Sequence, residues 1–259
     1  MTELLTIATA AAKAAGSEIL KHYENFKIEL KADNSPVTTA DLAANDAIFG
    51  ILERSQIPIC SEENLLNEND RLNLKRFWLV DPLDGTKDFI AKTGQFCTCI
   101  ALIEGGRPIL SAIYAPVFGD LYYADESGSY KNGNLIEPKN PAPNVALVGF
   151  HNNPSAAKDA VFAHFGVEMK KIASAIKYCA IAQNQAFLNL GSNKMSLWDV
   201  AAGDLILRQS GGILLNLLTR EPPMYNTKEL KMPPTLALNR ENAHLADEIC
   251  EIWSKNRQI

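Results

Sequence analysis

The chain has 259 residues, of which 47% are hydrophobic and 21% charged, a composition typical of a folded globular protein. Its net charge of −5 and scattered lysines and arginines exclude an electrostatic basis for binding a nucleic-acid polymer. The sequence has no apolar stretch as long as a membrane span, and Glu3 stands where a secretory signal would carry positive charge. We therefore expect no transmembrane segment and a cytoplasmic location, and peripheral association with the inner membrane stays open.

The first elements of the chain alternate between helix and strand. Residues 2–23 carry apolar side chains at helical spacing and predict an amphipathic helix, and residues 26–30 predict a short strand. A second helix is expected over residues 41–54, with inward-facing side chains at Leu42, Ile48, Phe49 and Leu52. Asp41 lies at the start of this helix, where the local sequence favours an N-cap over a catalytic role.

The most informative stretch is Asp81-Pro-Leu-Asp-Gly-Thr86, which follows an apolar strand. Gly85 permits a sharp turn, and Thr86 begins the first turn of a predicted helix, whose free N–H groups attract anions. Asp81 and Asp84 would repel such an anion unless a divalent cation lay between them. The alternative is an ordinary polar turn, because Asp-Pro and Asp-Gly are common turn formers, and the local sequence leaves both interpretations open.

The cysteines predict buried thiols in a reducing compartment. Their number is odd and their spacing matches no disulfide framework: Cys60, Cys97, Cys99, Cys179 and Cys250. Cys97-Thr-Cys99 alternates along an expected strand, so the two thiols should share one face. A second cysteine pair and a nearby histidine are both lacking, so the sequence favours buried thiols over a zinc site.

The remaining sequence predicts two subdomains of layered α and β structure. Short apolar runs and Gly- or Pro-containing turns over residues 96–130 predict an antiparallel meander. Residues 132–144, with three prolines, mark the expected boundary between an α+β subdomain at 1–140 and an α/β subdomain at 141–259. In the latter, strands are expected at 145–150, 168–172, 186–190, 213–218 and 235–238, and helices at 154–165, 174–183, 198–212 and 241–255.

Three motifs taken together resemble those of the inositol monophosphatase superfamily of metal-dependent phosphatases. They are Ser61-Glu-Glu63, Asp81-Pro-Leu-Asp-Gly-Thr86 and Trp198-Asp-Val-Ala-Ala-Gly203, and their order and spacing match the family over most of the chain. The resemblance implies an α/β fold, a sandwich of alternating α-β-α-β-α layers. The N-terminal subdomain would supply most metal ligands, and the C-terminal subdomain would close the site.

Further segments resemble the CysQ-type branch of this superfamily: Lys31-Ala-Asp-Asn-Ser-Pro-Val-Thr38, Lys87-Asp-Phe89 and Tyr114-Ala-Pro-Val117. Members of this branch are 3′(2′),5′-bisphosphate nucleotidases, which remove the 3′-phosphate from adenosine 3′,5′-bisphosphate. The resemblance therefore implies a small phosphorylated substrate, a nucleotide. It also implies inhibition by Li⁺ and a homodimer.

The resemblance implies that two or three Mg²⁺ ions serve as cofactor. Their ligands would be carboxylates and one backbone carbonyl: Glu62, Asp81, Asp84, Asp199 and Leu83. All-oxygen ligation suits this hard cation, and so many carboxylates converge only around cations. Asp41 and Thr86 would orient and deprotonate the attacking water, assisted by Glu63. The substrate would contact Glu62, Leu83, Asp84, Gly85, Thr86, Ser174, Lys177 and Asp199.

Residues for the second phosphate match the branch only in part. Ser174-Ala-Ile-Lys177 resembles its Ser-x-x-Lys turn, although Lys177 fits a solvated helix charge equally well. His151 matches a histidine of the branch, but the preceding Ser-Arg-Ser is not matched. An arginine expected before Trp198 is also missing, and the nearest cation, Lys194, does not reproduce its bidentate hydrogen bonds. The nucleotide is therefore less firmly implied than phosphatase chemistry.

The implied reaction is direct in-line attack of water on the phosphorus. Phosphate monoesters hydrolyse so slowly that a lone acid or base, contributing about 10²–10⁴-fold, is insufficient without metal ions. The four histidines form no cluster that could activate a serine or cysteine nucleophile. The alternatives are an inositol- or sugar-phosphate phosphatase with the same metal site and a non-catalytic regulatory binding protein. The full set of implied metal and water-activating residues is present, which favours an enzyme.

Overall fold

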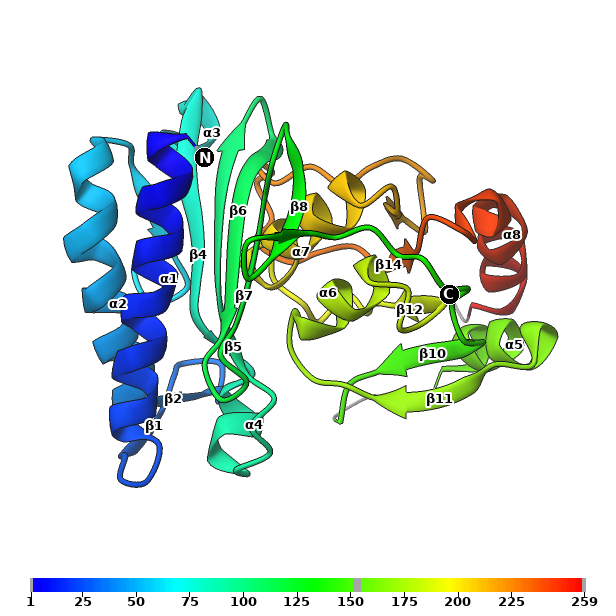
Figure 1. The fold of residues 1–259 in the computed structure, drawn as a ribbon, viewed down its shortest axis with the longest axis horizontal. Coiled ribbons are helices and arrows are strands. Elements are labelled where there is room, and N and C mark those ends of the chain that lie inside the picture. The colour runs from blue at the N-terminus through cyan, green and yellow to red at the C-terminus, as the bar shows by residue number, and fades with distance from the viewer. Residues whose placement is uncertain (1, 151–154, 258–259) are drawn as a thin grey trace.

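The computed structural model describes residues 2–150 and 155–257, so His151 and the first residue of the helix expected at 154–165 lie outside the described residues. Five layers follow one another along the long axis of the molecule (Figure 1). The layers are, in order, a helix pair, a seven-stranded sheet, a second helix pair, a five-stranded sheet and a third helix pair. This arrangement confirms the predicted α-β-α-β-α layering. The three pairs are α1 (Glu3–His22) with α2 (Thr39–Leu52), α6 (Ile176–Ala182) with α7 (Trp198–Gln209), and α5 (Ala156–Phe165) with α8 (Ala246–Asn256).

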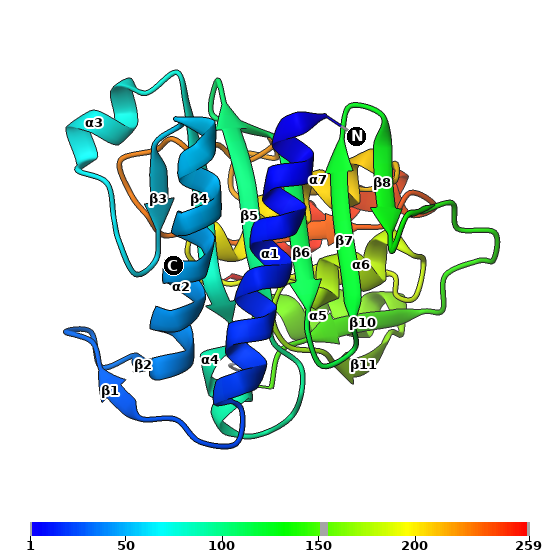
Figure 2. The same cartoon turned by 60° about the vertical axis from the view of Figure 1, so that its left-hand side comes forward.

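The seven-stranded sheet contains the predicted meander and runs in the order β3-β4-β5-β6-β7-β8-β9. Only the β3–β4 pair is parallel among these strands, and each following pair is antiparallel. Helices α1 and α2 lie side by side across one face (Figure 2). The strands are β3 (Ile59–Ser61), β4 (Arg76–Asp84), β5 (Cys97–Glu104), β6 (Arg107–Ala115), β7 (Asp120–Asp125), β8 (Gly128–Lys131) and β9 (Asn134–Leu135).

The five-stranded sheet is mixed and has the order β11-β10-β12-β14-β13. Strand β10 pairs in parallel with both β11 and β12, whereas β14 pairs antiparallel with β12 and β13. The strands are β10 (Val145–Val148), β11 (Glu168–Lys171), β12 (Leu188–Leu190), β13 (Ile213–Asn216) and β14 (Thr235–Leu238). The division of the chain near residue 140 into two subdomains remains a prediction.

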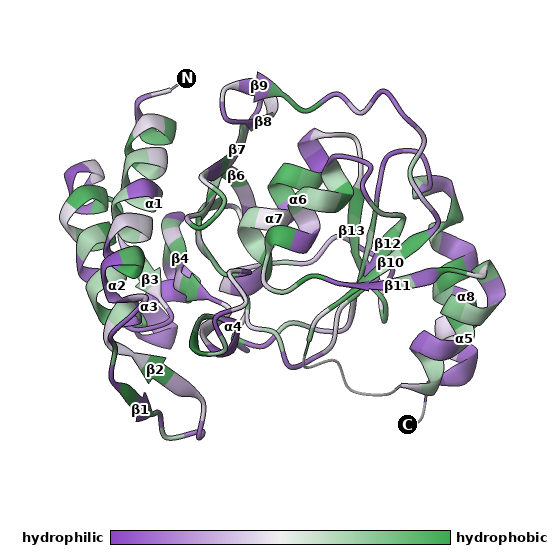
Figure 3. Cartoon of the chain, turned by 60° about the horizontal axis from the view of Figure 1, so that its bottom comes forward, coloured by the Kyte–Doolittle hydropathy of each residue, from purple (hydrophilic) through white to green (hydrophobic). Residues whose placement is uncertain are grey.

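Hydrophobic side chains fill the spaces between all five layers. Helices α6 and α7 are largely hydrophobic because sheets cover them on both sides, whereas the outer helices α5 and α8 also carry hydrophilic residues (Figure 3). Among the helices that the structure describes, none combines the length and apolar character that a membrane span requires.

The start of α2 differs from the prediction. Thr38 is the N-cap, and Asp41 lies three residues later, where its carboxylate accepts a hydrogen bond from the Thr38 N–H in a capping box. Leu42 is 46% exposed instead of inward-facing, because the small residues Ala40 and Ala44 occupy the buried face against α1. Ile48 and Leu52 are buried as predicted, and Phe49 packs at the edge of the same cluster.

Several short elements were not predicted from the sequence, notably α3 (Glu68–Asn73). This polar helix is held by the buried Arg71, whose guanidinium donates to the carbonyl oxygens of Thr227 and Lys228 at 2.5 and 3.0 Å. A contact over more than 150 residues of sequence leaves no local periodicity to detect. Other short elements that were not predicted are β2 (Pro36–Thr38) and the 3₁₀ turns Glu53–Ser55 and Ala243–Leu245, whereas β1 (Ile28–Leu30) and α4 (Thr86–Ile90) confirm the predicted short strand and helix start.

Candidate active site

A β-bulge in β4 turns two carboxylates toward the same side of the large sheet. Asp81 pairs with Cys99 and Asp84 pairs with Cys97, so two residues of β4 lie opposite Thr98 alone. In a regular strand, side chains three positions apart point to opposite faces; the extra residue of the bulge brings Asp81 and Asp84 to one face. The Thr98 hydroxyl donates to the Pro82 carbonyl at 2.9 Å and thereby fixes the bulge.

Gly85 makes the sharp turn from this strand into α4. Its φ of +96° lies in the left-handed region, and a Cβ atom there would approach the Gln95 carbonyl oxygen to 3.2 Å. Helix α4 begins at Thr86, as predicted, and extends only to Ile90. The glycine of the motif is therefore required by backbone conformation and by space.

The third motif brings a carboxylate from α7 to the same place. The Ser196 N–H donates to Asp199 Oδ2 at 2.8 Å and orients the side chain at the start of the helix. Asp81, Asp84 and Asp199 each place a carboxylate oxygen within 4.8 Å of the other two. Gly203 lets α7 pack closely against α6, because a Cβ atom at this residue would overlap the ring of Tyr178.

The three carboxylates are held in an unfavourable electrostatic state. Desolvation and repulsion by neighbouring acids raise the pKa of Asp81 well above its usual range. The same effects raise the pKa of Asp84 to about 6 and that of Asp199 to about 7, although the charge of Lys177 counteracts both increases. A divalent cation among them would relieve the repulsion, and an all-oxygen donor set fits Mg²⁺. Asp81 is buried, whereas Asp84 and Asp199 remain partly exposed.

Asp41 and Thr86 are in direct contact, as the resemblance implies. The Thr86 hydroxyl lies 3.1 Å from Asp41 Oδ1 and 3.2 Å from the Leu83 carbonyl oxygen, and both are acceptors for its proton. The N–H and hydroxyl of Thr38 hold the other carboxylate oxygen at 2.7 and 2.6 Å. Burial raises the pKa of Asp41, while these hydrogen bonds oppose the increase. Asp41, the third helical residue of the α2 capping box, thus also belongs to the candidate site.

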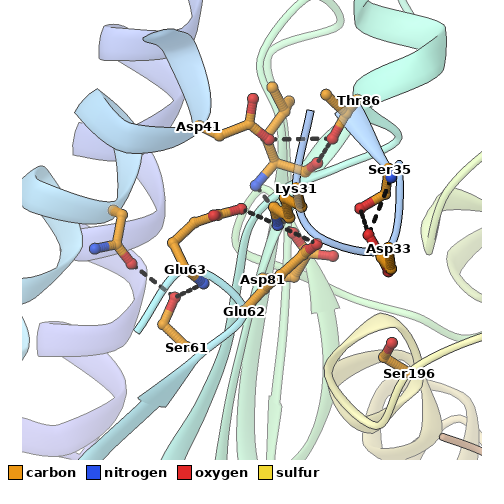
Figure 4. Close-up of polar contacts among 12 residues, drawn as sticks. Lys31, Asp33, Ser35, Asp41, Ser61, Glu62, Glu63, Asp81, Thr86 and Ser196 are labelled. Atoms are coloured by element: carbon orange, nitrogen blue, oxygen red, sulfur yellow. Dashed lines mark hydrogen bonds and ion pairs between the residues drawn. The ribbon is translucent and has the colours of Figure 1, made fainter. Parts of the chain in front are cut away.

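Glu62 and Glu63 share a cation that the sequence analysis did not assign to the site. Lys31, from the loop between β1 and β2, places its ammonium 2.8 Å from Glu62 Oε1 and 2.7 Å from Glu63 Oε1 (Figure 4). Glu62 therefore pairs with Lys31 and lies outside the group of three converging aspartates. The signal that could have revealed Lys31 is electrostatic, because adjacent glutamates near other acids need a positive partner.

The Ser-Glu-Glu motif is anchored through its serine. The Ser61 hydroxyl donates to Asn45 Oδ1 in α2 at 2.6 Å and accepts from the Glu63 N–H at 3.3 Å. Parallel pairing of Ser61 with Val80 places Glu62 beside the start of the bulge. Desolvation raises the pKa of Glu63, and its contact with Lys31 opposes the increase. The weakest of the three sequence motifs therefore has a defined structural role.

The predicted phosphate-pocket residues lie beside Asp84. The N–H of Ala175 donates to Asp84 Oδ2 at 2.5 Å, and Ser174 is buried with a φ of +53°. Lys177 is partly buried, and its ammonium donates to the Ser174 carbonyl at 2.7 Å, so it is not simply a solvated helix charge. A further cation, Lys231, donates to the Ser196 hydroxyl at 3.0 Å and was missed because its segment carries no motif.

The five-layered fold and its acidic cluster agree with the class of protein that comparison with known sequences shows, the phosphoric monoester hydrolases. A sequence model of the inositol monophosphatase family matches residues 1–254, and the chain belongs to this family.

Within this family, the chain is similar to several individual proteins of known name or structure. The chain is 36% identical over 209 residues to the 3′(2′),5′-bisphosphate nucleotidase CysQ of Shigella flexneri, covering 77% of this chain and 85% of the relative. The crystal structure of CysQ from Bacteroides thetaiotaomicron has a TM-score of 0.79 at 30% identity, covering 91% and 97% of the two chains. An IMPase/NADP phosphatase complexed with Mg²⁺ and phosphate shares the fold with a TM-score of 0.76 at 21% identity, over 93% and 90% of the chains.

Proposed function

We propose that the protein is a Mg²⁺-dependent phosphatase that hydrolyses adenosine 3′,5′-bisphosphate to AMP and phosphate. The observation that carries this proposal is the convergence of Asp81, Asp84 and Asp199 close to the hydrogen-bonded pair Asp41–Thr86. The CysQ relatives support the choice of nucleotide.

The residues present fit the cofactor that the family uses. Asp81, Asp84 and Asp199, with the Leu83 carbonyl and Glu62, would hold Mg²⁺ through oxygen atoms. When bound, Mg²⁺ acidifies water and neutralises charge on the phosphoryl oxygens. Glu62 would have to separate from Lys31 in order to act as a ligand of Mg²⁺. The number of ions, two or three, stays a prediction.

Asp41 and Thr86 would activate the attacking water. The Thr86 hydroxyl accepts a proton from water and passes its own proton to Asp41 Oδ1, which lies 3.1 Å away. Thr38 keeps the acceptor in place through two hydrogen bonds to the other oxygen. The water oxygen bonds to phosphorus as the phosphorus–O3′ bond breaks. The ribose oxygen takes up a proton from solvent, and Asp41 returns its proton to solvent after the step. Glu63, held by Lys31, would assist from beside Glu62.

Positive charge around the acids supports a substrate with a second phosphate. Lys177 in α6 lies close enough to Asp84 and Asp199 to oppose the increase that burial causes in their pKa values. Lys231, from the segment before β14, donates a hydrogen bond to the hydroxyl of Ser196, whose N–H holds Asp199. In our proposal the amides of Gly85 and Thr86 hold the scissile phosphate, and Ser174 and Lys177 contact the remainder of the substrate. Lys231 would supply part of the charge of the missing arginine.

The missing arginine also favours a second candidate, an inositol- or sugar-phosphate phosphatase with the same metal site. Phosphate release should therefore be compared for adenosine 3′,5′-bisphosphate, inositol 1-phosphate and fructose 1,6-bisphosphate with Mg²⁺, using Asp84→Asn as the blank. We expect a strong preference for the nucleotide. Preference for either other ester would support the second candidate, and release from none would contradict both.

A non-catalytic regulatory role would require a different experiment. An Asp84→Asn variant that restores the phenotype of a deletion strain as well as the wild type does would favour binding over catalysis. The homodimer and the cytoplasmic location stay predictions. All five cysteines are buried free thiols, as expected for a reducing compartment.

A further inference from the structure

Two thiols and one carboxylate form a compact group where β5 pairs with the bulge of β4. Cys97 and Cys99 lie on one face of β5, as predicted, and their sulfur atoms are 3.8 Å apart. Each sulfur is 3.9 Å from Asp84 Oδ2. The three ligand atoms thus form a nearly equilateral triangle.

The spacing of this triangle matches a tetrahedral soft-metal centre. With zinc–sulfur bonds of about 2.3 Å and tetrahedral angles, two thiolate sulfurs lie about 3.8 Å apart, and a sulfur and a carboxylate oxygen about 3.6 Å apart. The observed distances of 3.8, 3.9 and 3.9 Å require little movement to reach this geometry. The Ser174 hydroxyl, 3.5 Å from the sulfur of Cys97, is a polar neighbour of the same group.

We propose that Cys97, Cys99 and Asp84 form a binding site for a soft divalent cation such as Zn²⁺ or Cd²⁺. Binding releases the proton of each thiol to solvent and involves no oxidation, so the dication is held by two thiolates and one carboxylate. The spacing of cysteines and histidines in the sequence favours buried thiols over a zinc site, because the third ligand here is an aspartate. The third ligand comes from the register across the bulge, which pairs Asp84 with Cys97.

The position of Asp84 gives this site a consequence for catalysis. The same side chain belongs to the cluster of three aspartates, whose oxygen donors suit Mg²⁺, whereas thiolates select softer cations. A soft cation at the thiols would withdraw Asp84 from the aspartate cluster and stop hydrolysis reversibly. This inhibitory part rests on the proposed function, whereas the binding part does not.

Binding is tested by titrating the reduced, metal-free full chain with Cd²⁺ and following the ultraviolet charge-transfer absorption of cadmium–thiolate bonds. We expect one Cd²⁺ per chain. Separate Cys97→Ala and Cys99→Ala variants should each bind more than about 100-fold more weakly, because loss of a ligand exceeds the effect of losing an outer-shell partner. The control is Cys250→Ala, which removes a buried thiol from α8 and should leave the titration unchanged.

Equal titrations for the wild type and both site variants would overturn the proposal. If circular dichroism shows that the cysteine variants do not fold, Asp84→Asn keeps both thiols and should still weaken Cd²⁺ binding. Inhibition is measured separately as phosphate release with excess Mg²⁺. Cd²⁺ should inhibit the wild type, a chelator with fresh Mg²⁺ should restore it, and Cys99→Ala should resist relative to its own uninhibited rate. If no substrate is hydrolysed, the proposed function fails while the absorption titration still decides the binding site.

Discussion

Helix α7 carries two carboxylates that the fold treats in opposite ways. Asp204 is buried, and its Oδ2 lies 3.1 Å from the Arg107 guanidinium and accepts a hydrogen bond from the Tyr225 hydroxyl at 3.0 Å. Asp199, little more than one turn earlier, faces Asp81 and Asp84. Desolvation raises the pKa of both aspartates, but a nearby arginine opposes the increase at Asp204, whereas the Asp84 carboxylate reinforces it at Asp199.

This difference separates structural acids from acids that await a ligand. A buried acid that pairs with a basic side chain of the same chain has its charge compensated, and removing the basic side chain leaves an uncompensated buried charge. Acids that face one another store repulsion that only an external cation relieves. Substitutions at the acidic cluster and at the Asp204–Arg107 pair should therefore have opposite effects on activity and stability.

The largest expected effect is at the acidic cluster. Asp84→Asn keeps an acceptor for the Ala175 N–H but removes the charge that would bind Mg²⁺. Phosphate release should fall about 10⁴-fold, equivalent to about 5 kcal/mol of transition-state stabilisation. The melting temperature in EDTA should stay the same or rise because repulsion is reduced. A variant with near-normal turnover would contradict the role of this cluster.

The opposite pattern is expected where the acid is paired. Arg107→Ala should lower the free energy of unfolding by about 3–5 kcal/mol, because Asp204 would stay buried without its cation. The activity per folded molecule should be retained. Arg76→Ala is the matched control, since its pair with Glu104 is partly exposed to solvent and worth about 0–1 kcal/mol. Denaturant unfolding measures both variants, and an equal loss of unfolding free energy in the two would contradict the distinction between the two ion pairs.

The pH dependence of stability should reveal the unpaired acids. The pKa values of Asp84 and Asp199, about 6 and about 7, exceed the unfolded value of about 3.9, so the folded chain binds more protons in this window. In EDTA, stability should be greatest below about pH 4 as far as these two groups are concerned, and should fall as pH rises toward 7. Saturating Mg²⁺ should suppress the fall in melting temperature between pH 5 and 8. An unchanged slope with Mg²⁺ would argue against cation binding by these acids.

The smallest effect is expected from Li⁺. This small, hard cation should occupy a weakly held Mg²⁺ position and partly reduce phosphate release at tens of millimolar, while equal concentrations of KCl correct for ionic strength. Full activity in Li⁺ would count against the position of this chain within its family.

Most helices and strands were predictable because apolar periodicity reports burial over each whole element, whereas the order of the layers was implied by the resemblance to the family. Leu42 shows where this reasoning fails, since small alanines and not the larger leucine form the contact between α1 and α2. Helix α3 was missed because a distant contact of Arg71 holds it in place. Burial of a residue by a remote partner leaves no trace in its immediate sequence neighbours.

The site was predictable where a motif marks a backbone requirement, as at Gly85 and Gly203. Contacts set by register were not predictable, because pairing of Asp84 with Cys97 depends on one extra residue in β4. The contact of Lys31 with both glutamates likewise depends on how the loop between β1 and β2 folds over the site. The motifs identify the acidic residues of the site, but only the tertiary structure identifies the residues that contact them.

The bulge in β4 also constrains how this gene can change. Substitutions in β4 alter one side chain, but inserting one residue beside Thr98 in β5 would set two residues opposite two and restore a regular ladder. The sheet would then pair more evenly, while one of the two aspartates would turn to the other face. The relative length of β4 and β5 therefore matters as much as their composition, and we expect a single-codon insertion in β5 to keep the sheet while it separates the acids of the site.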